Sequence, residues 1–233
     1  MRRRRFLLVA VAALSGALLV GAAISSRAMA TAPVVPEASD VQLHGSYGSM
    51  TVSWRPPATA SFDHVTIWEV IDDGTPFVVY RGTGTSATFT GIDNSKDYLL
   101  HVVVFTKDGL LSAGTNVELS PDTFLFAPED GLLVPAPPRL TWAAVPGARF
   151  YNVQLSQNGE KLFSSWPRVR HLQLRGAWRF GGHRRALHPG RIHWYVWPAF
   201  GTRADPQYGK PLGASAFIVP GSACKASLQS ETC

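Results

Sequence analysis

The stretch LTWAAVPGARFYNV, residues 140–153, predicts the fold because it joins two strand-like segments through a proline-glycine pair. Residues 138–142 are strand-like, and residues 148–156 alternate strictly between two sets of side chains. The sequence Asn158-Gly159 follows and is a strong hairpin signal. The two alternating sets are Tyr151, Val153 and Leu155 against Phe150, Asn152 and Gln154. Alternation of this kind predicts a strand with one buried and one outward face.

Similar short segments extend from this stretch in both directions and are separated by Gly, Pro, Asn and Asp. On the N-terminal side they are residues 49–54, 64–71, 77–80, 85–90, 97–106 and 110–119. On the C-terminal side they are residues 161–166, 169–174, 191–197 and 212–219. Short strands at this spacing are typical of β-sandwiches, and no segment after residue 30 keeps a convincing helical period. The predicted fold class is therefore all-β.

The composition agrees with this prediction. Charged residues make up 16% of the chain, which is low for a protein with long solvated helices, whereas Gly 21 and Pro 17 suit many turns. The formal net charge of +6 includes five arginines within residues 1–30. Without that segment the chain is close to neutral, so the overall charge is a poor argument for nucleic-acid binding.

The N-terminal segment predicts export. Arginines at positions 2–5 precede an apolar run, residues 6–24, and Ala28-Met29-Ala30 forms an A-x-A cleavage site. This order is that of a signal peptide, and Arg3 to Leu7 also matches the core of a twin-arginine signal. The alternative is an uncleaved membrane anchor formed by residues 6–24. Both alternatives place the rest of the chain outside the cytoplasm, either secreted or in the cell envelope.

The residues of the first half resemble the fibronectin type III family. Trp54 corresponds to the family's tryptophan on the second strand. Ile92 and Tyr98, with Val102 and Val104 beyond them, are similar to its L-x-P-x-T-x-Y-x-x-x-V-x-A stretch. The resemblance implies that Tyr98 is a corner tyrosine, whose hydroxyl bonds back to the chain.

The second half is similar to the bacterial variety of this family. Residues 140–153 resemble its L-T-W-x-x-V-P-G-A-x-x-Y-x-V run, and residues 187–196 resemble its L-x-P-G-x-Y-Y-W-x-V run. Three positions depart from the family patterns. In the first half Asn94 replaces a proline and Lys96 a threonine, and in the second half Ile192 stands where a tyrosine is expected.

The resemblance implies two tandem Ig-like, fibronectin type III β-sandwiches behind the export segment. The predicted boundaries are residues 1–30 for the signal peptide or anchor, 31–39 for a spacer, 40–121 for the first domain, 122–220 for the second with a basic insertion at 175–186, and 221–233 for a polar tail. Residues 120–130 are expected to act as a hinge. Cys224 and Cys233 in the tail are predicted to form a short-range disulfide, with two free thiols as the alternative.

The acidic and basic residues are distributed unevenly. Residues 31–126 hold four basic and eleven acidic residues, whereas residues 127–233 hold thirteen basic and five acidic ones. Residues 162–204 contain no carboxylate. Trp142 and Trp194 are expected in the core, so any ligand site is expected in the insertion. The candidate site residues are Arg175, Trp178, Arg179, Arg184 and Arg185.

Three interpretations of this basic and aromatic stretch remain open. In the first, the stretch is a solvated surface, or its positive charge complements the acidic first domain. In the second, it is a binding site for anionic envelope polymers or glycans. In the third, it binds nucleic acid, which an exported protein rarely meets. We predict a non-catalytic binding module without cofactor or metal, because no catalytic or metal-binding motif occurs. Its partner is a protein or an anionic polysaccharide, and membrane contact is expected only through an uncleaved N-terminal segment. The alternatives are a structural spacer and an accessory domain of a secreted carbohydrate-active system.

Overall fold

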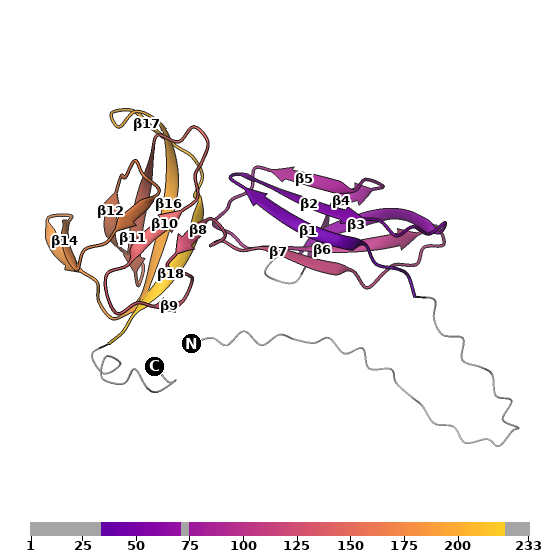
Figure 1. Cartoon of the computed structure of the whole chain (residues 1–233), viewed down its shortest axis with the longest axis horizontal. Coiled ribbons are helices and arrows are strands. Elements are labelled where there is room, and N and C mark those ends of the chain that lie inside the picture. The colour runs from indigo at the N-terminus through magenta and orange to yellow at the C-terminus, as the bar shows by residue number, and fades with distance from the viewer. Residues whose placement is uncertain (1–33, 71–74, 222–233) are drawn as a thin grey trace, which may run out of the picture. The chain divides into compact units, whose positions relative to one another are not determined.

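The computed structural model describes residues 34–70 and 75–221. The predicted signal segment, Cys224 and Cys233 lie outside these residues. The described residues contain strands and turns but no helix, so the all-β prediction is confirmed. None of the described segments is a helix long and apolar enough to cross a membrane. Strands β1 to β7 and strands β8 to β18 form two separate groups (Figure 1).

The first sandwich consists of two antiparallel sheets, one with strand order β1-β2-β5 and one with β4-β3-β6-β7. Hairpins join β1 to β2, β3 to β4 and β6 to β7, and β5 returns to pair with β2. The strands are β1 (Ser39–Ser46), β2 (Ser49–Arg55), β3 (Phe62–Val70), β4 (Pro76–Gly82), β5 (Ser86–Thr90), β6 (Tyr98–Thr106) and β7 (Thr115–Leu119). Each segment predicted between residues 49 and 119 thus overlaps one strand, although β7 begins five residues later than predicted, and β1 was not among the predicted segments.

The core of the first sandwich lies between these sheets. On β2 the alternation of residues 49–54 buries Met50, Val52 and Trp54, each no more than 3% exposed. They pack against Val65 and Ile67 of β3 and against the alternate β6 residues Leu100, Val102 and Val104. Glu69 lies opposite the core residue Leu100 of β6 and is partly buried, and this burial raises the pKa of its carboxyl. Burial of these side chains supplies the main stabilising term of the sandwich.

The second sandwich repeats the arrangement with additional short strands. One sheet has the order β13-β10-β8, and the other has β12-β11-β16-β18-β9 with β17 paired to β16. The strands are β8 (Leu125–Ala127), β9 (Leu132–Leu133), β10 (Arg139–Trp142), β11 (Phe150–Gln157), β12 (Glu160–Ser165), β13 (His171–Gln173), β14 (Ala177–Phe180), β15 (His183–Ala186), β16 (Gly190–Gly201), β17 (Pro206–Tyr208) and β18 (Gly213–Val219).

The core of the second sandwich contains the two tryptophans that the sequence placed there. Trp142 and Trp194 are at most 1% exposed and pack with Tyr151, Val153 and Leu155. The predicted alternation of β11 is confirmed, because these three residues face the core while Asn152 and Gln154 do not.

One segment differs from its predicted role, and the insertion has a regular structure. Residues 120–130, expected to be a hinge, include strand β8, which pairs with β10 as part of the second sandwich. The backbone N–H of Ala143 also donates to the carbonyl of Phe124, so the segment is held in the sandwich. The basic insertion, residues 175–186, is a regular hairpin formed by β14 and β15.

The corner tyrosine implied by the resemblance is present in the first sandwich. The hydroxyl of Tyr98 accepts a hydrogen bond of 3.0 Å from the backbone N–H of Asp93. In the second sandwich Ile192 is fully buried and cannot make such a bond. A different tyrosine provides a related one there, because the Tyr151 hydroxyl accepts from the N–H of Val145 at 3.1 Å. Each sandwich thus has a loop N–H satisfied by a tyrosine hydroxyl.

Replacing Tyr98 by Phe removes this acceptor and leaves the N–H of Asp93 without its partner. We expect the free energy of unfolding to fall by about 1–2 kcal/mol, the usual effect of an orphaned, partly buried backbone group. Urea denaturation followed by circular dichroism measures the change. Tyr195→Phe is the control, because the Tyr195 hydroxyl has no hydrogen bond within the described residues. Equal stability of Tyr98→Phe and the wild-type chain would contradict the assigned role.

Candidate functional site

The five candidate site residues lie on or next to the hairpin β14–β15. Gly181 and Gly182 form its two-residue turn, with φ angles of 58° and 80° that side chains other than glycine rarely adopt. A Gly-Gly pair between two short segments is a recognised hairpin signal. The strands pair Ala177 with Ala186, Trp178 with Arg185 and Arg179 with Arg184. The sequence signal for this hairpin was therefore present, although the prediction treated the segment only as an insertion.

Alternation along the two strands separates the candidate residues into two groups. Trp178 and its partner Arg185 face one side of the hairpin, and Arg179 and its partner Arg184 face the other. We call the first group the anchoring face and the second, together with Arg175, the cationic face.

The anchoring face holds the hairpin against the edge strand β12. The indole N–H of Trp178 donates to the backbone carbonyl of Leu162 at 2.8 Å, and its ring meets Phe163 edge to face at 5.4 Å. Arg185 donates to the carboxylate of Glu160 at 2.6 Å. Trp178 is half-buried against the second core. These two residues are therefore committed to contacts within the protein, and their role in ligand binding stays a prediction.

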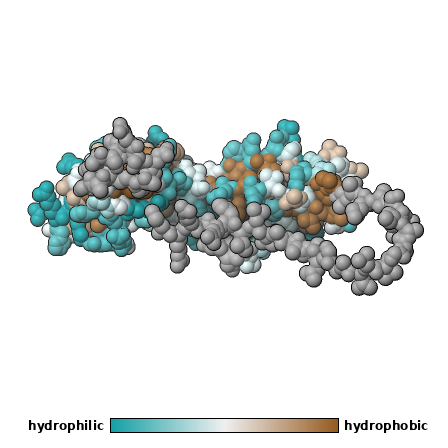
Figure 2. Space-filling model, turned by 90° about the horizontal axis from the view of Figure 1, so that it is seen from below, coloured by the Kyte–Doolittle hydropathy of each residue, from teal (hydrophilic) through white to brown (hydrophobic). Residues whose placement is uncertain are grey.

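The cationic face has no such contacts. Arg175, Arg179 and Arg184 line a solvent-open pocket of about 510 Å³ together with Ala177 and Trp178. Within the described residues none of the three arginines pairs with a carboxylate. The end of the second sandwich that carries β14 is hydrophilic in Figure 2. Because Arg179 and Arg184 lie directly opposite each other, their charges repel, and an anion between them would relieve this repulsion.

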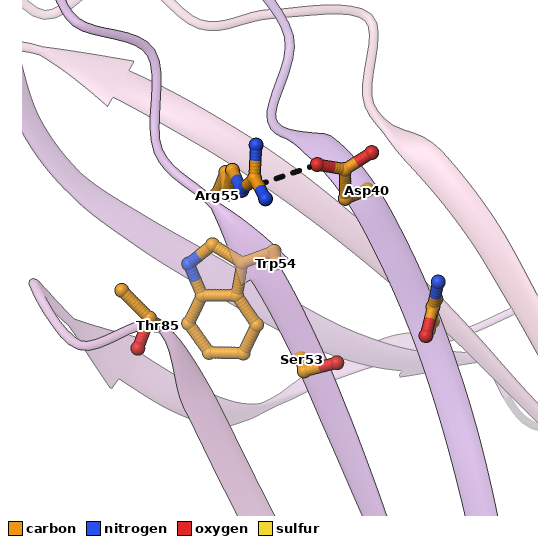
Figure 3. Close-up of a pocket in the computed structure, with 6 residues that line it drawn as sticks. Asp40, Ser53, Trp54, Arg55 and Thr85 are labelled. Carbon is orange, nitrogen blue, oxygen red and sulfur yellow. Dashed lines mark ion pairs between the residues drawn. The ribbon is translucent and has the colours of Figure 1, made fainter.

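A second pocket, on the first sandwich, has different electrostatics. It measures about 670 Å³ and is lined by residues of β1 and β2, together with Thr85 (Figure 3). Asp40 and Arg55 form an ion pair of 3.2 Å across its opening, and both side chains are exposed. Trp54, which forms its base, is part of the core. The charges of this pocket are thus matched within the protein, which makes it less suited to a charged ligand.

The remaining titratable side chains form no candidate centre. Across residues 34–70 and 75–221, no group of three or more His, Cys, Asp or Glu side chains is placed to hold a metal ion. Of the arginines outside the hairpin, Arg191 pairs with Asp130 at 2.8 Å. His183 and His193 are exposed, as expected for solvated histidines. The cationic face is therefore a cluster of unpaired positive charge that is open to a ligand.

The sequence matches no family model and no curated protein. Solved structures similar to it include tandem fibronectin type III proteins and a receptor chain. A two-domain fibronectin type III segment of chicken tenascin is 16% identical over 78% of this chain and 98% of its own, with a TM-score of 0.34. The fibronectin(III)-like modules of CbhA from Clostridium thermocellum are 15% identical over 83% of this chain and 98% of theirs, with a TM-score of 0.29. The chicken interferon gamma receptor alpha chain is 10% identical over 81% of this chain and 100% of its own, with a TM-score of 0.36.

The strand order of the two sandwiches and the corner tyrosine of the first agree with a tandem of fibronectin type III-like sandwiches. A fold of this kind is consistent with an interaction or spacer module and does not identify a ligand.

Proposed function

We propose that this chain is an exported, non-catalytic binding module that engages an anionic polymer of the cell envelope through the cationic face of β14–β15. The N-terminal arginines, apolar run and A-x-A site support export. The absence of catalytic motifs from the sequence supports a binding role. The partner we favour is an acidic polysaccharide or a phosphate-containing polymer.

The observation that carries this proposal is the convergence of Arg175, Arg179 and Arg184 on one pocket without a carboxylate partner. Two of them are held opposite each other by strand pairing, so the repulsion between them is built into the backbone. The planar guanidinium group of arginine can donate two parallel hydrogen bonds to a phosphate or carboxylate. A polymer with repeating anionic groups would therefore be bound by pairs of hydrogen bonds from each guanidinium group, in addition to general electrostatic attraction.

The anchoring face explains how a short hairpin can present these arginines. Trp178 donates to a carbonyl of β12, and the Arg185–Glu160 pair fixes the opposite strand. Trp178 is thus oriented by the sandwich and is also one of the residues that line the pocket. This arrangement pre-organises the cationic face, which lowers the conformational entropy lost on binding.

The test is binding of the full chain, produced without residues 1–30, to isolated cell envelope and to two soluble probes, polyphosphate and polygalacturonate. We expect binding that weakens with added salt, because screening reduces the attraction between exposed charges. Replacing both Arg179 and Arg184 by Ala should weaken binding by about tenfold or more, because tenfold corresponds to about 1.4 kcal/mol, less than two charge-assisted contacts contribute. Biolayer interferometry across a salt series measures both effects.

The matched control replaces Arg168 and Arg170, two exposed arginines outside the hairpin, and removes the same net charge. Loss of binding in the Arg179/Arg184 variant alone supports a specific site. Equal loss in both variants would show attraction by overall charge and would overturn the site. Absence of binding to envelope and probes at low salt would leave a structural spacer, or a module for a protein partner, as the function.

A further inference from the structure

The outer face of the large sheet in the second sandwich carries an aromatic pair. On β16 the side chains of Trp194 and Val196 enter the core, so Tyr195 and Trp197 between and beyond them must point outward. Their rings lie 5.8 Å apart with an angle of 35° between the planes. Both side chains are partly exposed, and neither belongs to the core cluster. Two neighbouring aromatic rings are thus presented along one strand.

Strand pairing places polar, uncharged side chains beside each ring. Gln154 of β11 lies opposite Tyr195, and Asn152 lies opposite Trp197. Ser164 of β12 follows in the same row as Gln154 and donates a 3.0 Å hydrogen bond to the side-chain oxygen of Asn152. This bond orients the Asn152 amide on the sheet surface. The two rows therefore alternate an aromatic ring with amide and hydroxyl groups.

Several polar groups on this face have no partner within the protein. In the part of the chain that the structure describes, the Gln154 amide, the Tyr195 hydroxyl and the Trp197 indole N–H make no hydrogen bond, and none of them is fully buried. They are free to donate to or accept from a ligand that lies across the rings.

A second exposed aromatic pair continues the face. The indole N–H of Trp166 donates to the hydroxyl of Tyr208 at 2.7 Å, and these residues are 42% and 44% exposed. The ring of Phe150 contacts the ring of Tyr208 edge to face. Phe150 is almost fully buried, but it lies on the outer side of the sheet and not in the core between the sheets. Arg203 donates to the carbonyl of Trp166 at 2.6 Å. The second pair is thus held in place on the same side of the sheet.

The chemistry of this face favours a sugar chain. A pyranose ring has an apolar C–H surface that can stack on an aromatic face, and a rim of hydroxyls that suits amide, hydroxyl and indole N–H groups. The two rows of side chains carry no charge, so they match a neutral ligand and offer no counter-charge to an acidic one. The apolar centre with Arg anchors that is typical of protein–protein hot spots is absent from these rows.

We propose that the outer face around Tyr195 and Trp197 binds a neutral polysaccharide, which lies across the two rings and hydrogen-bonds to Gln154 and its neighbours. This site is separate from the cationic face and differs in its ligand, because it requires neither an anion nor low salt. It does not depend on the proposed anion-binding function and can be tested independently of it.

The test is affinity gel electrophoresis of the full chain without residues 1–30 in gels containing soluble neutral polysaccharides. The probes are hydroxyethyl cellulose, xylan, galactomannan, β-1,3-glucan and soluble starch. We expect retardation by at least one of them, unchanged by salt and unchanged in the Arg179/Arg184 variant. In the retarding gel the double variant Tyr195→Ala with Trp197→Ala should lose affinity by about tenfold or more, the usual effect of removing central aromatic anchors.

The matched control is Phe77→Ala, which removes a 45% exposed aromatic ring from β4 of the first sandwich. Gln154→Ala is a second variant that leaves both rings in place and should also weaken retardation. Circular dichroism establishes that each variant is folded. Lack of retardation by all five polysaccharides, or retardation that persists in both the double variant and Gln154→Ala, would overturn the proposal. A dimer that dissociates in the double variant would also overturn it, because the face would then be occupied by a second copy.

Discussion

Replacing Trp194 by Ala is expected to lower the free energy of unfolding of the second sandwich by about 3–5 kcal/mol, the range seen for large core aromatics. Trp194 is fully buried between the sheets and packs with residues of both. Its removal would expose no new surface to water but would leave a cavity that the surrounding strands can fill only in part. Because single domains are stable by only about 5–15 kcal/mol, such a loss would leave the second sandwich close to unfolding. Guanidinium denaturation followed by tryptophan fluorescence and circular dichroism measures it.

Two control variants separate packing from other effects. Trp194→Phe should lower the free energy of unfolding clearly less than Trp194→Ala. The indole N–H of Trp194 is buried without a hydrogen-bond partner, so its loss breaks no hydrogen bond. Trp166→Ala removes a tryptophan that is 42% exposed, and we expect a loss of no more than about 1.5 kcal/mol from its hydrogen bond to Tyr208. A Trp194→Ala variant as stable as Trp166→Ala would contradict the position of Trp194 in the core.

Alternation predicted the core of both sandwiches, because the side-chain period of a strand is a local property. The set Met50, Val52 and Trp54 and the set Tyr151, Val153 and Leu155 are buried as their spacing required. Most of the long strands were therefore located correctly, but β1 (Ser39–Ser46) was not among the predicted segments. The short strands β8, β9 and β17 have two or three residues each, which is too few for a period to be visible in the sequence.

The candidate site was only partly accessible to the same reasoning. Composition located the arginines of residues 175–186, but it could not separate those that face a ligand from those that anchor the hairpin. That separation depends on the register between β14 and β15 and on the contacts of Trp178 and Arg185 with β12. The aromatic face depends even more on non-local pairing, because β11 and β16 bring Gln154 beside Tyr195. Neither residue forms a sequence motif with the other.

The departure of Asn94 from the fibronectin type III pattern also has a structural explanation. Asn94 stands where the family has a proline, and its side chain is 1% exposed. Its side-chain oxygen accepts from the N–H of Gly48 at 2.8 Å, and its amide donates to the carbonyl of Ser46 at 3.1 Å. Gly48 has a φ of 74° in the turn between β1 and β2. Asn94 thus ties this turn to the loop that leads into β6.

Replacing Asn94 by Ala is therefore expected to lower the free energy of unfolding of the first sandwich by about 2–4 kcal/mol. The variant loses two hydrogen bonds and leaves the N–H of Gly48 and the carbonyl of Ser46 without their partners. Urea denaturation followed by circular dichroism measures the loss.

Asn116→Ala is the matched control for Asn94→Ala, because the Asn116 side chain is exposed and its one side-chain hydrogen bond to another described residue is to the ring of His101. We expect Asn116→Ala to lower the free energy of unfolding by no more than about 1 kcal/mol. Asn94→Pro restores the family residue, yet it should be destabilised as strongly as Asn94→Ala, since proline cannot replace either hydrogen bond. A stable Asn94→Pro variant would show that the first sandwich depends on the conformation of this loop rather than on the two bonds of the buried amide.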